Sequence, residues 1–141
     1  MTRDEIVQLF TERQKATVRR DAAAMASFHA VDGTLDSPMA GGIIQGRENI
    51  ERVFEAWFKG FPDLVSTEHD LLVEGNRVVY ISSLEGHDSG GFMGLPPTGK
   101  PFRVTMVFAG TVEHGEIAHA KTIYDFTGLL VQIGVLKAKP L

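Results

Sequence analysis

The sequence predicts an α+β fold in which helices pack on one side of a curved antiparallel sheet. Up to Pro62, hydrophobic residues recur at helical spacing, and after Pro62 they alternate as in strands. Two turn sequences, Gly75-Asn76 and His114-Gly115, divide the second part into four strands. A chain whose helices come first, and whose strands then follow as a meander, is typical of this fold class.

The composition limits the kinds of protein that this chain can be. With 141 residues, 43% of them hydrophobic, it can bury one core without disulfides or metals, and we expect a single domain over residues 1–141. A net charge of −4 with scattered basic residues argues against nucleic acid or a membrane as partner. The absence of cysteine excludes disulfides and thiolate chemistry and is compatible with the cytoplasm. The charged N-terminus and the lack of a long apolar run predict a soluble protein without a signal peptide.

Helices are predicted in the first part of the chain. Thr2 and Glu5 form a capping-box pattern that predicts a first helix over residues 3–19, and Asp21 is expected to cap a short second helix. An extended segment follows and ends at Pro38, and residues 39–46 are expected to form a loop. The clearest helix comes next and ends at Gly60 and Pro62. One buried stripe is formed by Ile50, Val53, Phe54, Trp57 and Phe58.

The turn at His114-Gly115 fixes a predicted register for the last hairpin, because the turn makes Glu113 pair with Glu116. Continuing outward, Met106 would pair with Ile123 and Val104 with Asp125. The face toward the helices would then hold Val104, Met106, Phe108, Ile117 and Ile123, together with His119, Lys121 and Asp125. The opposite face would be small and semi-polar, which favours either a homodimer interface or a solvated surface.

Asp125 is the sharpest candidate for chemistry. On this register it lies on the apolar face, where a buried carboxylate suits a general acid or base. Two other readings stay open, namely that strand fraying exposes Asp125 or that it caps the helix predicted over "TGLLVQI". Lys121, on the same predicted face, could bind an anionic group or form an imine, or it could extend to the sheet edge.

Four further residues are weaker candidates. His87 opens the long loop "GHDSGGFMGLPPTGKPF" and faces either a pocket or solvent. Asp36 points inward or forms an Asx-turn before Pro38. Phe54 and Trp57 belong to the core and leave an edge available to a ligand.

Three familiar motifs are excluded. "GLPPTGKP" resembles a phosphate-binding loop, but Pro101 replaces the required serine or threonine and a strand follows instead of a helix. The five histidines have no metal-ligand spacing, so we expect no metal. A hydrolase triad is unsupported, because no G-x-S-x-G elbow is present.

Three segments, "GRENIERVFEAWFKGFPDL", "GHDSGGFMGLPPTGKPF" and "GEIAHAKTIYDFTGLLVQIG", resemble the SnoaL-like polyketide cyclase and ester cyclase group of the NTF2-like superfamily. The resemblance implies an α+β cone that encloses a pocket for a hydrophobic small molecule. It also implies that Asp125 is the general acid/base of an intramolecular aldol ring closure. The chain departs from the family pattern at Lys121, where a tryptophan is usual, and at Asp36, where a histidine is frequent.

Together these features predict a cofactor-independent cyclase or isomerase acting on a hydrophobic carbonyl compound. Asp125 and His87 would be catalytic, and both His87 and Lys121 would be donors that stabilise the developing oxyanion. The alternatives are a binding module without catalysis and an epoxide-hydrolase-like enzyme using Asp36 and Asp125. The residues predicted to bind the substrate are Lys121, Asp36, His119, Trp57, Phe54, Met106, Phe108, Phe92 and Met93.

Overall fold

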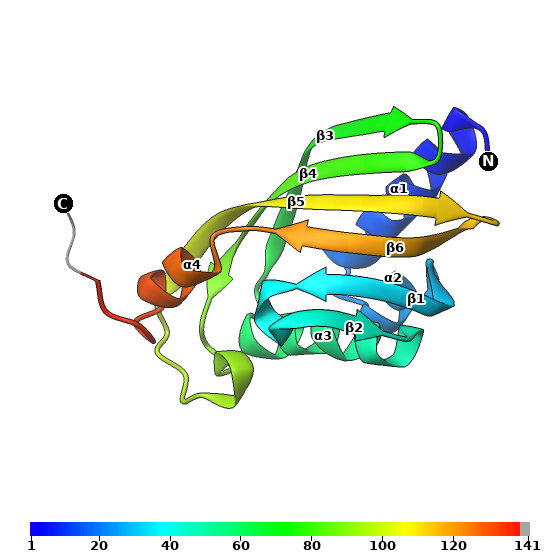
Figure 1. Cartoon of the computed structure of the whole chain (residues 1–141). Coiled ribbons are helices and arrows are strands. Elements are labelled where there is room, and N and C mark those ends of the chain that lie inside the picture. Colours follow the sequence, from blue (N-terminus) through cyan, green and yellow to red (C-terminus); the bar gives the residue numbers. More distant parts are fainter. Residues whose placement is uncertain (139–141) are drawn as a thin grey trace.

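The computed structural model describes residues 1–138 and has a mixed α+β architecture (Figure 1). The helices are α1 (Arg3–Val18), α2 (Ala22–Ser27), α3 (Arg47–Gly60) and α4 (Phe126–Gln132), with short 3-10 turns at Pro38–Ala40 and Phe92–Gly94. The strands are β1 (His29–Ser37), β2 (Gly42–Gln45), β3 (Val65–Glu74), β4 (Arg77–His87), β5 (Pro101–Glu113) and β6 (Glu116–Ile123).

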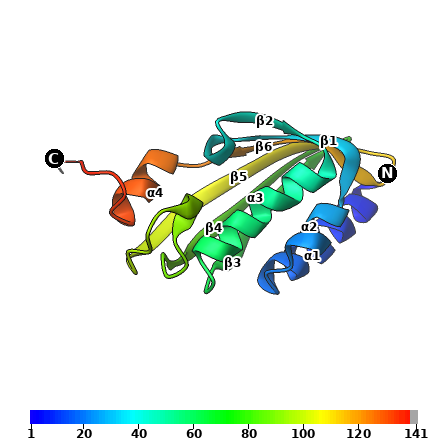
Figure 2. The same cartoon turned by 90° about the horizontal axis from the view of Figure 1, so that it is seen from below.

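All six strands form one curved sheet in the order β2-β1-β6-β5-β4-β3. Strand β1 runs parallel to β6, and the other neighbours are antiparallel. Helices α1, α2 and α3 cover one face, as the view from below shows (Figure 2). Helix α4 lies beyond the end of β6 and beside the start of β5, next to the long loop between β4 and β5 (Figure 1). The predicted fold class is therefore confirmed, and no helix within residues 1–138 lies on the other face of the sheet.

The predicted helix starts are confirmed by their caps. The Thr2 hydroxyl accepts a hydrogen bond from the Glu5 backbone N–H, and the Glu5 carboxylate accepts one from the Thr2 N–H, as a capping box requires. The Asp21 carboxylate caps α2 in the same way through the N–H of Ala24. The expected loop over residues 39–46 is wrong in part, because residues 42–45 pair with β1 as edge strand β2.

The predicted register of the last hairpin is wrong beyond its first pairs. Glu113 pairs with Glu116 as expected, but Val112 pairs with Ile117 while Thr111 pairs with His119, so Ala118 is an extra residue in β6. Such a β-bulge moves every later side chain of the strand to the opposite face. Ala120 and Thr122 therefore face the helices. His119, Lys121 and Ile123 lie instead on the open face.

Two hydrophobic clusters fill the space between the sheet and the helices. The first lies under α1 and α2 and contains Phe10, Ile50 and Phe108. The second lies between the end of α3, the 88–100 loop and α4, and contains Trp57, Phe61, Phe92, Leu129 and Ile133. Among residues 1–138, no helix is both long and apolar enough to cross a membrane.

Candidate functional site

A cavity lies between the helical layer and the sheet, where the two clusters meet. Its volume is about 70 Å³, several times the roughly 10–15 Å³ that one water molecule needs. Helices α1, α2 and α3 form one wall, and the inward side chains of β1, β3, β4, β5 and β6 form the other. The lining residues are Arg13, Gln14, Thr17, Met25, Leu35, Ser37, Val53, Phe54, Trp57, Phe58, Leu64, Ser66, Tyr80, Ser82, Leu84, Met106, Phe108 and Thr122.

Arg13 is the charged side chain of this lining. It follows Ile6, Leu9 and Phe10 on the buried stripe of α1, at a position where an apolar residue would complete the pattern. Only 8% of Arg13 is exposed, and its guanidinium carbon lies 4.7 Å from the Phe108 ring centroid and 5.4 Å from that of Phe54. Burial lowers the pKa of Arg13 to about 10, so the guanidinium is still charged at neutral pH.

Tyr80 and Gln14 form a short hydrogen-bonded chain on the sheet side of the cavity. The Tyr80 hydroxyl donates to Gln14 Oε1 at 2.6 Å, and Gln14 Nε2 donates to the Ser66 carbonyl at 3.2 Å. Burial is the main cause that raises the pKa of Tyr80, so its phenol is neutral at physiological pH. This chain places a neutral hydroxyl group within an otherwise mainly apolar wall.

His29 lies behind the same wall. It is fully buried at the start of β1, and its ring centroid is 5.7 Å from that of Phe54 and 6.2 Å from that of Phe108. Within residues 1–138, neither ring nitrogen has a hydrogen-bond partner. The pKa of His29 lies well below its ordinary value, mainly because the ring is buried. The positive charges of Arg13 and Arg47 lower this pKa further. His29 is therefore a neutral imidazole beside a cationic guanidinium.

Four of the predicted binding residues line the cavity, namely Phe54, Trp57, Met106 and Phe108. Phe92 is buried behind Trp57, with ring centroids 5.4 Å apart, and supports the wall without lining it. Its neighbour Met93 is 45% exposed, because a left-handed backbone (φ 56°) turns the chain outward there.

The charged candidates of β1 and β6 are not inside the cavity. His119 and Lys121 are exposed on the open face, so their predicted inward orientation is wrong. Asp36 lies between the cavity-lining Leu35 and Ser37, so its side chain points to the opposite face of β1. In the sheet it is the register partner of Lys121.

Asp125 is exposed at the end of β6, and its predicted position on the apolar face is wrong. Its side chain accepts a hydrogen bond of 2.8 Å from the Gly128 N–H and so caps α4. The preceding residue, Tyr124, packs on Trp57 with ring centroids 5.4 Å apart. The sequence left two readings open beside catalysis, namely strand fraying and helix capping. The hydrogen bond to Gly128 matches helix capping.

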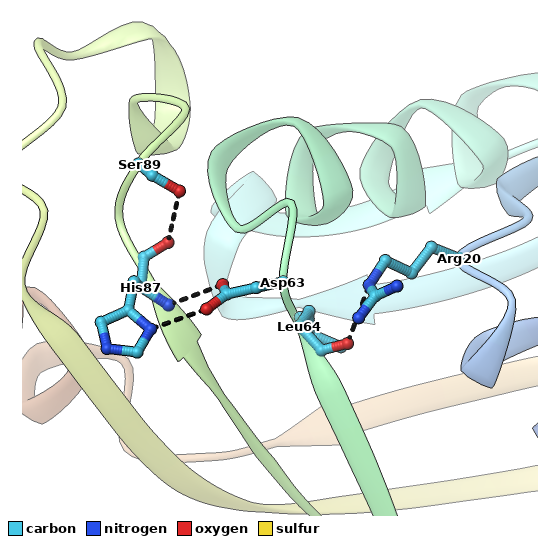
Figure 3. A network of polar contacts seen from close by, with 5 residues as sticks. All are labelled: Arg20, Asp63, Leu64, His87 and Ser89. Carbon is cyan, nitrogen blue, oxygen red and sulfur yellow. Dashed lines mark hydrogen bonds and ion pairs between the residues drawn. The ribbon is translucent and has the colours of Figure 1, made fainter.

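His87 ends β4 and pairs with Asp63 outside the cavity (Figure 3). The Asp63 carboxylate accepts hydrogen bonds from the His87 backbone N–H at 2.9 Å and from its ring Nδ1 at 2.6 Å. Both bonds lower the pKa of Asp63, and the bond from the His87 backbone has the larger effect. Both side chains are about half exposed, so the pair anchors the start of the 88–100 loop at the surface.

Sequence reasoning missed Arg13, Gln14, Tyr80 and His29. Two of them had a detectable signal: Arg13 interrupts the apolar stripe of α1, and Tyr80 shares the inward face of β4 with Val78. Gln14 and His29 carry no such signal, because neither position belongs to a pattern that the sequence makes visible.

The family model described as SnoaL-like polyketide cyclase matches residues 7–133. No curated protein matches the chain significantly. Among solved structures, AclR from Streptomyces galilaeus is 23% identical, with a TM-score of 0.84 over 99% of this chain and 87% of its own. TsrD from Streptomyces laurentii is 25% identical, with a TM-score of 0.83 over 96% of this chain and 99% of its own. IdmH from Streptomyces antibioticus is 28% identical, with a TM-score of 0.75 over 91% of this chain and 97% of its own.

Proposed function

Because the chain belongs to the SnoaL-like polyketide cyclase family, we propose that it is a cyclase or isomerase acting on a carbonyl-bearing small molecule. The substrate would occupy the cavity under α1 and α3. The observation that carries the proposal is a cavity with aromatic and aliphatic walls that contains a neutral, buried Tyr80 hydroxyl. A few polar groups in an apolar cleft are the usual composition of a small-molecule site.

The chemistry would be an intramolecular aldol-type closure or a related proton shift. A base removes a proton from the carbon next to a carbonyl, and the resulting enolate attacks a second carbonyl of the same molecule. A carbon–carbon bond forms, and the alkoxide takes up a proton. The Tyr80 hydroxyl, turned from Gln14 toward the substrate, would donate a hydrogen bond to the developing oxyanion.

The mechanism also needs a residue that acts as the base. None of the residues that line the cavity is an aspartate, a glutamate or a histidine. Asp125 stays the predicted acid/base by family resemblance, and His87 stays its predicted helper, although both lie at the surface. The same observation favours the second candidate function, a binding module that holds a hydrophobic ligand without transforming it.

Deuterium exchange tests the proposal without knowledge of the natural substrate. We expect the protein to accelerate exchange of the methyl protons of 2-acetylnaphthalene with D2O, measured by proton NMR. Tyr80→Phe should slow the catalysed exchange roughly a hundredfold, because it removes one donor to the enolate oxygen. Saturable binding of the ketone without any acceleration would favour the binding module.

Two substitutions at Asp125 separate catalysis from capping. Asn retains an N-cap acceptor but cannot act as a base, whereas Ala removes both functions. If Asp125 is the base, both variants lose the exchange activity. If it only caps α4, Asp125→Asn keeps the activity and Asp125→Ala loses about 1 kcal/mol of stability.

We also propose a homodimer that forms through the open face of the sheet. Strand residues with apolar side chains there include Val79, Val107 and Ile123, and no helix covers them among residues 1–138. A cytoplasmic location and the absence of nucleic-acid partners stay predictions from composition.

A further inference from the structure

We propose that the ligand of the cavity is an anion, and that its carboxylate pairs with the guanidinium of Arg13. This inference names the substrate class of the site and so rests on the proposed function. It begins from a buried cation whose compensating charge is not supplied by the described part of the chain.

The three ion pairs within residues 1–138 join Lys15 to Glu12, Arg47 to Glu116 and His87 to Asp63, and none of them includes Arg13. The Nε atom of Arg13 is buried and has no hydrogen-bond partner among the residues that the structure describes. Its neighbour Tyr80 is a neutral phenol and cannot serve as a counter-ion. Arg13 is thus an uncompensated charge in an apolar site.

Such a charge is costly to keep. Removing one partner of a buried ion pair strongly destabilises a protein, because the remaining charge is left unpaired and without water. The rings of Phe54 and Phe108 offset part of this cost through cation–π contacts. They attract the cation but do not neutralise it. A methionine at this position would extend the apolar stripe of α1 without the cost.

The geometry around Arg13 specifies the complementary ligand. A guanidinium presents its donors as a planar fork that matches a carboxylate, with two parallel hydrogen bonds. Thr17 and Tyr80 line the same cavity. Their hydroxyl groups donate to the Arg13 carbonyl and to Gln14 Oε1, so each hydroxyl oxygen can still accept a hydrogen bond from a second polar group of the ligand. The remaining wall is apolar and is formed by Trp57, Phe58 and Met106, and its aromatic rings favour stacking on a flat apolar group. The expected ligand is therefore an aromatic or polyene carboxylic acid.

A matched pair of probes tests the inference. 2-Naphthoate and 2-naphthamide have the same shape, and only the first is charged at pH 7.5. By titration calorimetry, the wild-type protein should bind naphthoate at least about tenfold more tightly than the amide, since hydrogen bonds between two charged groups are stronger than those to a neutral amide. Arg13→Met should remove this preference, and Arg13→Lys should keep part of it.

The control is Arg19→Met, which removes an exposed arginine from the end of the same helix and should leave the preference unchanged. Equal binding of acid and amide by the wild-type protein would overturn the role of Arg13 while leaving the cavity as a small-molecule site. Binding of neither probe would overturn the site itself, and the proposed function with it. If Arg13→Met does not fold, the wild-type preference and the Arg13→Lys variant decide the question.

Discussion

Arg13 and His29 are two basic side chains that contact the same pair of rings, Phe54 and Phe108. Two positive charges in one apolar region would repel each other and would both lack water. The lower intrinsic basicity of imidazole decides which of them gives up its proton. Arg13 therefore keeps its charge for a ligand, and His29 is held neutral in the folded state.

This division predicts a specific pH dependence of stability. The pKa of His29 lies well below 6.5 in the folded state and near 6.5 in the unfolded chain. Below pH 6.5 the unfolded state therefore binds a proton that the folded state does not. The free energy of unfolding then decreases as the pH is lowered. From pH 6.5 to 5, the unfolding free energy should drop by up to about 1.4 kcal/mol per pH unit from this residue alone.

Urea unfolding of His29→Leu at each pH checks this expectation. The variant should show a shallower decline than the wild-type protein, because it has no proton to take up at this position. His114→Asn is the control: it removes an exposed histidine at a turn with φ 52°, a conformation that asparagine tolerates. Equal slopes for wild type and His29→Leu would show that His29 is already charged in the folded protein.

At the scale of elements, the interior of the 88–100 loop is held by the carboxylate of Asp88. Asp88 is fully buried and accepts hydrogen bonds from the backbone N–H groups of Gly91, Phe92 and Thr98, and from the Thr98 hydroxyl. These bonds hold Phe92 against Trp57, which lines the cavity. Asp88 thereby connects the conformation of a surface loop to one wall of the site.

Asp88→Ala should cost about 2–4 kcal/mol, because buried donors lose their acceptor. Trp57 is the single tryptophan of the chain, so its fluorescence reports the wall directly. We expect a red-shifted emission and faster proteolysis within residues 92–100. Ser89→Ala, at an exposed position of the same loop, should behave as wild type. Unchanged emission in Asp88→Ala would mean that the wall does not depend on the loop.

Features of the fold that depend on local sequence were predictable, whereas those that depend on contacts between distant segments were not. Caps, turns and hydrophobic spacing are local, and they predicted the helices and the turns of both hairpins correctly. The bulge at Ala118 has no local marker, since it depends on how β6 pairs with β5 and β1 together. One extra residue then reversed the predicted faces of His119 and Lys121. The cavity itself is a product of tertiary packing, so Arg13 was visible only as an interruption in a stripe.

At the scale of the whole molecule, the sheet has one face packed on helices and one face left open (Figure 2). On the open face, Leu72 and Ile123 are about half exposed and Ile43 is 74% exposed. Ile43 and Leu72 lie at opposite edges of the sheet, whereas Ile123 is the direct cross-strand partner of Val107 on the same face. An uncovered apolar patch around such a pair marks an interaction site in soluble proteins. The face also carries Asp36 and Lys121, which have opposite charges, so a second copy rotated by a two-fold axis can present complementary groups.

A homodimer through this face predicts a mass of about twice 15.4 kDa in analytical ultracentrifugation. Val107→Asp places a charge among the apolar side chains of β5 and should shift the protein to monomer, because an unpaired carboxylate at an interface is not compensated. Val18→Asp makes the same chemical change at a 58% exposed position of α1, on the helical side, and should leave the dimer intact. If the wild-type protein sediments as a monomer at all concentrations, the proposed dimer does not form. If the dimer survives Val107→Asp, its interface lies elsewhere.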